Sequence, residues 1–129
     1  MKILIVDDDS VMLSLMKRML AGESYRVKTA TNGEDALRAY RHFKPDLVIT
    51  DIQMPRKSGL ELIKGIRMIK PSVGVIYMSG NTEGFVEQIE REKREFAADY
   101  LPKPFAIEDL ISAVSTHSQR RRRENHVAA

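Results

Sequence analysis

The chain has 129 residues, a length that accommodates one domain with its own core and leaves little room for a second. Hydrophobic residues make up 43% and charged residues 30%, as in ordinary globular domains, and the absence of cysteine excludes disulfides, thiolate metal sites and cysteine nucleophiles. The formal net charge of +3 comes from Arg120–Arg123 together with Glu124, which leaves 17 basic and 17 acidic residues in the rest of the chain.

Apolar runs and amphipathic runs alternate from the N-terminus onward. Buried strands are predicted over residues 2–6, 25–30, 47–50, 73–78 and 100–101, where aliphatic and β-branched residues cluster between polar segments. Helical spacing of apolar residues predicts helices over residues 11–21, 36–40, 60–66, 83–95 and 107–114. Ser10 is the expected N-cap of the first helix, with Asp9 as the alternative, and residues 79–82 are expected to form a polar turn.

Five strand–helix units in strict alternation predict an α/β fold. Strands that are apolar on both faces fit a parallel sheet with helices covering both of its faces. In such a sheet, ligands bind beyond the carboxyl ends of the strands, near the point where the strand order reverses. Residues 1–118 are expected to form this domain, and residues 119–129 a basic polar tail that is flexible or serves as a linker.

Charged and hydroxyl side chains gather at that carboxyl edge. Asp7, Asp8 and Asp9 follow the first strand, and Asp51 follows the third. Ser79 follows the fourth strand and Lys103 the fifth. Carboxylates about 4 Å apart repel by about 4 kcal/mol at an effective dielectric of about 20, so such a group attracts protons or a cation. Oxygen ligands without His or Cys favour Mg²⁺. A lysine and a hydroxyl beside a magnesium site indicate phosphoryl transfer, with one carboxylate as the nucleophile.

Each of these residues alone also has a purely structural explanation. Asp9 could cap a helix, Asp51 could belong to a turn, and Lys103 could be a solvated surface side chain. Their common position after successive strands favours the functional interpretation. No chemistry is assigned to the three histidines, His42, His117 and His126, because none shows metal-ligand spacing.

Four short motifs resemble those of the receiver domains of bacterial response regulators. They are Ile5–Asp9, Val48–Pro55 followed by Gly59, Met78–Gly80 and Tyr100–Phe105, and the resemblance covers roughly residues 2–117. It implies a doubly wound, flavodoxin-like (CheY-like) fold with a five-stranded parallel sheet in the order 2-1-3-4-5 and five helices. It also implies a role as a response regulator in two-component signal transduction.

The resemblance assigns a role to each residue of the site. Asp51 would accept the phosphoryl group and Lys103 would bind that group, with a cis peptide bond between Lys103 and Pro104. Mg²⁺ would be gathered by Asp7 and Asp8 and ligated directly by Asp8, Asp51 and the backbone carbonyl of Gln53. Asp9, one residue further on, would lie outside the ligand set.

The resemblance also implies a switch and its partners. Ser79 would move toward the phosphoryl group and Tyr100 would turn inward with it, which remodels the face formed by the fourth helix, fifth strand and fifth helix. The phosphoryl donor would be a phosphohistidine on a sensor kinase or a phosphotransfer protein. The domain would assist its own phosphorylation and dephosphorylation without being an enzyme, and such proteins often form homodimers through the same face.

Some positions depart from the commonest pattern of that family. Ser79 replaces the more frequent threonine, and Ser58 stands where aspartate or asparagine is common. The stretch between Ser79 and Lys103 is longer than usual, which predicts an extended fourth helix. Gln53 and Asn81 occupy variable positions that resemble those tuning the dephosphorylation rate.

Two other functions remain open at this point. An aspartyl-nucleophile phosphohydrolase would use similar chemistry, but Gln53 stands where its general acid is expected and no sequence is left for a cap domain. A phosphorylation-independent interaction module would neither bind Mg²⁺ nor be stabilised by it.

The remaining sequence features concern location and output. The N-terminus lacks the apolar run of a signal peptide, and no apolar stretch reaches the roughly 20 residues of a membrane span, so we expect a cytoplasmic protein. About a dozen residues after the fifth helix cannot fold a DNA-binding domain, and binding of nucleic acid is not expected. The domain signals either alone, through a downstream protein partner, or as the first domain of a longer protein with an output domain.

Overall fold

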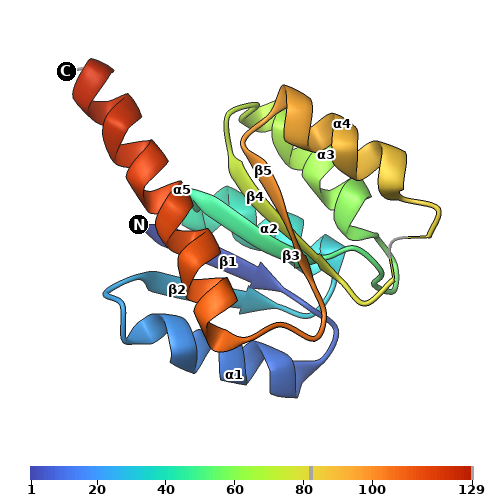
Figure 1. Cartoon of the computed structure of the whole chain (residues 1–129). Coiled ribbons are helices and arrows are strands. Elements are labelled where there is room, and N and C mark those ends of the chain that lie inside the picture. The colour runs from blue at the N-terminus through green and yellow to red at the C-terminus, as the bar shows by residue number, and fades with distance from the viewer. Residues whose placement is uncertain (82, 129) are drawn as a thin grey trace.

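The computed structural model of the chain describes residues 1–81 and 83–128. Thr82, which ends the predicted turn, and Ala129 lie outside these residues, as do the side chains of residues 125–128, including His126. The described elements are β1 (Lys2–Val6), α1 (Ser10–Ala21), β2 (Arg26–Ala30), α2 (Gly33–Phe43), β3 (Leu47–Asp51), α3 (Gly59–Ile69), β4 (Gly74–Ser79), α4 (Val86–Glu95), β5 (Ala98–Pro102) and α5 (Ile107–Ala128), as Figure 1 shows.

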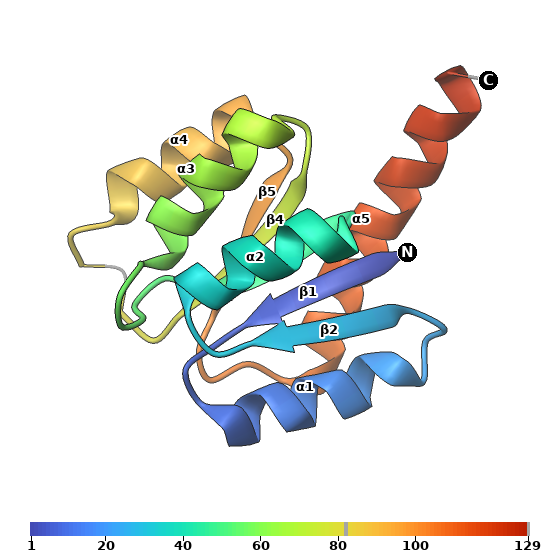
Figure 2. The ribbon, with the colours of Figure 1, turned by 180° about the vertical axis from the view of Figure 1, so that it is seen from behind.

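The strands form one parallel sheet in the order β2-β1-β3-β4-β5. This is the predicted doubly wound, flavodoxin-like arrangement. Helices α1 and α5 cover one face of the sheet, whereas α2, α3 and α4 cover the other; α5 lies in front of the sheet in Figure 1 and behind it in Figure 2. Because both faces are covered, every residue of β3 and β4 is buried, while the edge strand β2 is mostly exposed or half-buried.

Two apolar clusters hold these layers together. On one face, strand residues pack against α1 and α5, with Ile3, Ile5, Ile76, Leu13, Met16, Leu110 and Val114 among the fully or nearly fully buried members. On the other face, Leu4, Val48, Val75, Leu62, Ile66 and Ile89 belong to the cluster under α2, α3 and α4. No helix among the described residues is long and apolar enough to span a membrane.

Two helix starts differ from the sequence-based expectation. Asp9, not Ser10, is the N-cap of α1, since its side chain accepts hydrogen bonds from the backbone N–H groups of Val11 and Met12. Helix α4 begins at Val86 instead of residue 83, after Gly84 at a φ of +87°. The prediction of an extended fourth helix is therefore wrong, because α4 has 10 residues and ends at Glu95.

Helix α5 is much longer than its apolar periodicity indicates. The predicted helix covers residues 107–114, but α5 continues to Ala128 and includes the segment expected to be a flexible tail or linker. Arginine is a good helix former, so the run Arg120–Arg123 is compatible with this extension. Arg121 also reaches back to the sheet, where its Nε lies 3.2 Å from Asp46 Oδ1 at the amino-terminal edge.

Candidate functional site

Three carboxylates meet at the carboxyl edge of the sheet. Asp7 follows β1 and Asp51 ends β3, the neighbouring strand, and their exposed fractions are 1% and 9%. Asp8 lies beside them with its side chain exposed to solvent. One carboxylate oxygen from each residue lies within 4.8 Å of the other two, so this group could hold a metal ion. The parallel sheet thus brings together three of the aspartates singled out in the sequence.

Lys103, which follows β5, bridges two of these carboxylates. Its Nζ lies 2.8 Å from Asp7 Oδ2 and 3.2 Å from Asp51 Oδ2. Its backbone N–H donates to the carbonyl oxygen of Ser79 at 2.9 Å, and the peptide bond between Lys103 and Pro104 is cis. The lysine therefore contacts residues that precede it by 96 and 52 positions in the chain.

Burial and charge oppose one another at this site. Burial raises the pKa of the Asp51 carboxyl above its usual value, and it outweighs the nearby Lys103 ammonium, which acts to lower that pKa. For Lys103 the balance is reversed. Burial acts to lower the lysine pKa, but the Asp7 and Asp51 carboxylates outweigh it and hold the pKa above its usual value. The neighbouring carboxylates thus favour the charged form of the lysine beside Asp51.

Local backbone contacts hold the carboxylates in place. The backbone N–H of Asp9 donates to Asp7 Oδ1 at 2.9 Å, and that of Gln53 donates to Asp51 Oδ1 at 3.3 Å. Behind Asp51, α3 begins so close to the strand end that a Cβ at Gly59 would lie 2.1 Å from the Asp51 carbonyl oxygen. Ser58, the residue that departs from the common family pattern, caps α3 by accepting a hydrogen bond from the backbone N–H of Glu61.

Ser79 and Tyr100 are linked to each other, and the described contacts do not join either of them to Asp51. The Ser79 hydroxyl donates to the Asn81 carbonyl at 2.7 Å and accepts from the Asn81 N–H at 3.0 Å. The Tyr100 hydroxyl donates to the Ser79 carbonyl at 2.9 Å. The serine side chain is therefore turned toward the loop before α4, and the tyrosine hydroxyl is bonded to the backbone at the end of β4.

Comparison with known proteins agrees with this geometry. Residues 3–115 match the model of the response regulator receiver domain. The chain belongs to this family. The receiver domain is 33% identical over 126 residues to the DNA-binding transcriptional regulator NtrC of Escherichia coli (strain K12), with 95% of this chain and 26% of that protein covered. It is 31% identical over 128 residues to the response regulator MprA of Mycobacterium ulcerans, with 99% of this chain and 54% of that protein covered.

A solved structure shows the same architecture. The receiver domain superposes on a response regulator receiver domain protein from Clostridium thermocellum with a TM-score of 0.84 and 32% identity, covering 94% of this chain and 96% of that one. The chain spans about a quarter of NtrC and about half of MprA. It thus carries the receiver domain of a two-component response regulator, which is a signalling domain.

Two buried polar clusters in the receiver domain have no signal in the sequence. In the first, the Arg67 guanidinium on α3 donates to the Glu92 carboxylate on α4, with Nη2 2.8 Å from Oε1. The Tyr77 hydroxyl of β4 donates to the same oxygen at 2.7 Å. Burial and then the Glu92 carboxylate hold the pKa of the Tyr77 phenol far above its usual value. Because these residues come from three elements, no local spacing in the sequence predicts that they are in contact.

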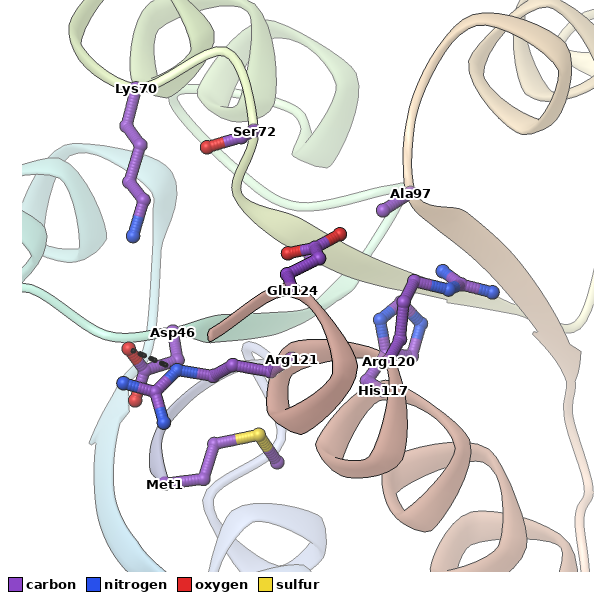
Figure 3. Close-up of a pocket in the computed structure, with 10 residues that line it drawn as sticks. Met1, Asp46, Lys70, Ser72, Ala97, His117, Arg120, Arg121 and Glu124 are labelled. Atoms are coloured by element: carbon purple, nitrogen blue, oxygen red, sulfur yellow. Dashed lines mark ion pairs between the residues drawn. The ribbon is translucent and has the colours of Figure 1, made fainter. Parts of the chain in front are cut away.

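The second cluster surrounds His117, to which the sequence assigns no chemistry. His117 Nε2 lies 2.6 Å from Asp99 Oδ2 without the alignment of a hydrogen bond among the described residues. Burial lowers the pKa of the imidazole, although the Asp99 carboxylate acts to raise it. The histidine is in the wall of a pocket of about 240 Å³, where Arg121 pairs with Asp46 (Figure 3). This pocket is at the amino-terminal edge of the sheet, away from Asp51.

Proposed function

We propose that Asp51 accepts a phosphoryl group and that this reaction switches the state of the domain. The observation that carries the proposal is the position of the Asp51 carboxylate, 3.2 Å from the Lys103 ammonium and within 4.8 Å of the carboxylates of Asp7 and Asp8. A carboxylate beside a fixed cation and further oxygen ligands is suited to attack phosphorus and to stabilise the transferred group.

The donor set fits Mg²⁺. All the side-chain groups offered are carboxylate oxygens, which this cation prefers. The oxygens of Asp7 already accept from Lys103 and from the backbone of Asp9, whereas the exposed Asp8 carboxylate is open to solvent. The resemblance to other receiver domains implies Asp8, Asp51 and the backbone carbonyl of Gln53 as the direct ligands, with Asp7 gathering the ion. When bound, Mg²⁺ would supply positive charge opposite the oxygens of the phosphoryl group.

The phosphoryl donor in this proposal is a phosphohistidine on a sensor kinase or a phosphotransfer protein. A carboxylate oxygen of Asp51 forms the new bond to phosphorus while the phosphorus–nitrogen bond breaks, and its electron pair returns to the imidazole of the donor. The product is an aspartyl phosphate on Asp51. Lys103 would hold an oxygen of the transferred group, and attack by water would later release inorganic phosphate and restore the carboxylate, at a rate tuned by Gln53 and Asn81.

The response to phosphorylation would begin at Ser79. Its hydroxyl would exchange the Asn81 carbonyl for a phosphoryl oxygen, since the new group adds about −1.5 to −2 charges and three strong acceptors. The Tyr100 hydroxyl already bonds to the Ser79 carbonyl oxygen, so a movement of Ser79 would displace this residue of β5 as well. The surface of α4, β5 and α5 would change as a result.

That surface is the proposed route to the output. It would bind a downstream protein or an output domain, or pair with a second copy of the chain. The relatives NtrC and MprA are longer than this chain, and NtrC is named as a DNA-binding transcriptional regulator. We propose that the receiver domain acts in the cytoplasm, where a sensor kinase presents its phosphohistidine.

Phosphorylation with a small donor tests the proposal directly. The chain is incubated with acetyl phosphate, with Mg²⁺ or with EDTA, and its intact mass is measured. We expect one added phosphoryl group in Mg²⁺, little in EDTA, and none in Asp51→Asn. Asp35→Asn, which changes an exposed carboxylate at the start of α2, serves as the matched control and is expected to react normally. Undiminished labelling of Asp51→Asn would refute the proposal.

A further inference from the structure

A small groove lies where α2 and α3 end, on the face of the sheet opposite α5. Its volume is about 370 Å³ and its apolar wall is made by Tyr40, Pro45 and Ile69. Tyr40 is buried at 4% exposure, whereas Ile69 is 53% exposed. The groove is therefore a partly open apolar surface and not a gap inside the core.

The rim of this groove is entirely basic. Arg41, Lys44 and Lys70 complete its lining, and all three are exposed. Among the described residues none of them forms an ion pair. Figure 3 shows Lys70 extending from the end of α3, while the nearby Asp46 carboxylate pairs with Arg121. The three cations are thus available to an external anion.

The basic surface continues around the end of α2. On its other side, Lys2 of β1 and Arg26 and Lys28 of β2 approach the Phe43 ring, with their charged groups 5.6, 6.0 and 6.0 Å from its centroid. These cations also make no ion pair among the described residues. Six positive charges therefore lie around the neighbouring ends of α2 and α3.

The needs of the fold explain only part of this charge. A helix C-terminus offers about half a negative charge, and Lys2 Nζ already contacts the Phe43 carbonyl oxygen at 3.3 Å. Arg26 and Lys28 protect the exposed edge of the sheet, where charged residues oppose strand pairing between molecules. The two helix ends at the groove together offer only about one negative charge, which does not offset the three cations that line it.

We propose that this groove binds an acidic segment of a partner protein. One apolar side chain of the segment packs against Tyr40, Pro45 and Ile69, and flanking carboxylates pair with Arg41, Lys44 and Lys70. An apolar floor with a basic rim matches such a segment better than it matches a single-stranded nucleic acid, whose bases stack on exposed aromatic rings, because the Tyr40 ring is buried. The groove lies at the amino-terminal edge of the sheet, so it can be occupied whatever the state of Asp51.

Selection from a random peptide library displayed on phage, with the full chain as the target, identifies the segments that bind. We expect enriched peptides with one aliphatic or aromatic residue flanked by Asp or Glu. Synthetic peptides are then measured by fluorescence anisotropy at low and high salt. Binding should weaken about tenfold in Lys44→Gln/Lys70→Gln and in Ile69→Ser, and it should weaken with salt because the charged groups are exposed.

The matched control removes two exposed cations from the other face of the molecule. Lys17→Gln/Arg18→Gln, at the end of α1, should bind within about twofold of the parent chain. All variants change exposed side chains, and their circular dichroism and melting temperatures must match the parent. The proposal fails if no peptide is enriched, if the enriched peptides lack acidic residues, or if the rim and floor variants bind as the parent does. It also fails if a single-stranded oligonucleotide binds the groove more tightly than the acidic peptides.

Discussion

The ammonium of Lys103 lies 3.2 Å from the carboxylate of Asp51 and only 2.8 Å from that of Asp7. These two carboxylates are almost wholly buried, so one lysine supplies much of the positive charge that makes their proximity tolerable. In this arrangement lysine and a divalent cation contribute to the same task, the neutralisation of charge at the end of the sheet.

Removal of this lysine should therefore make the fold dependent on a divalent cation. We expect Lys103→Met to lose about 3 kcal/mol of unfolding free energy in EDTA, because buried carboxylates lose their partner. Mg²⁺ should restore more stability to this variant than it adds to the parent. Thermal melts in EDTA and in Mg²⁺ measure both effects. Lys64→Met, at an exposed position of α3, is the control, and equal Mg²⁺ responses in all three proteins would contradict the prediction.

The contact between Arg67 and Glu92 should stabilise the packing of α4. Their side chains are 8% and 15% exposed, so Glu92→Gln leaves a nearly buried guanidinium without its counter-charge. We expect a loss of about 2–3 kcal/mol in urea unfolding. The exposed pair of Arg91 and Glu95 on the same helix is the control, and Glu95→Gln should change stability by less than about 0.5 kcal/mol. Similar losses for the two variants would show that burial does not govern these pairs.

Gly59 should tolerate no side chain. A Cβ there would lie 2.1 Å from the Asp51 carbonyl oxygen, so either α3 or the end of β3 must move. Gly59→Ala is expected to lose about 3 kcal/mol and to slow phosphorylation by acetyl phosphate, because the displaced backbone carries Asp51. Gly65→Ala on the same helix meets only a Leu37 methyl at 3.9 Å and should gain about 0.5–1 kcal/mol. Denaturant melts of the two variants should therefore shift in opposite directions.

His117 should make stability depend on pH. Its folded pKa is below the unfolded value of 6.5, because burial disfavours the imidazolium, while Asp99 and Arg120 act in opposite directions. At pH values above its unfolded pKa, the His117 imidazole is neutral in both the folded and the unfolded protein. As pH falls below it, the unfolded state binds a proton that the folded state resists, so stability is lost.

Melting temperatures between pH 7 and pH 5 test this pH dependence. The decrease should be smaller in His117→Gln than in the parent chain. His42→Gln, which changes an exposed histidine of α2, should retain the full decrease of the parent. If His117→Gln and the parent fall in parallel, the buried imidazole does not contribute.

The alternation of apolar and amphipathic segments was sufficient to predict five strands, five helices and a parallel sheet. The positions of the helix ends were harder to predict from the sequence. The start of α4 depends on Gly84 in the left-handed region, and α5 continues past Val114 without apolar periodicity, with His117 and Arg121 in contact with the sheet. Such long-range contacts leave no trace in a local pattern.

The site residues were predictable because a parallel sheet places the ends of its strands along one edge. That rule alone brings Asp7, Asp51 and Lys103 together. It says nothing about rotamers, and the Ser79 hydroxyl is in fact engaged with Asn81. It also misses Glu92 and His117, whose partners lie on other elements. Chain order predicts where strands end, whereas helix-to-helix and helix-to-sheet contacts depend on packing.

The unbroken course of α5 from Ile107 to Ala128 has a geometric consequence. The orientation of a protein fused after this helix would be set by the receiver domain, whereas a flexible linker would leave that orientation free. Each residue added at the junction would rotate the fused partner by about 100° and advance it by about 1.5 Å, since an α-helix has about 3.6 residues per turn. One or two added residues would rotate the partner to another side of the helix axis. Three or four would bring its rotation about that axis close to the original value.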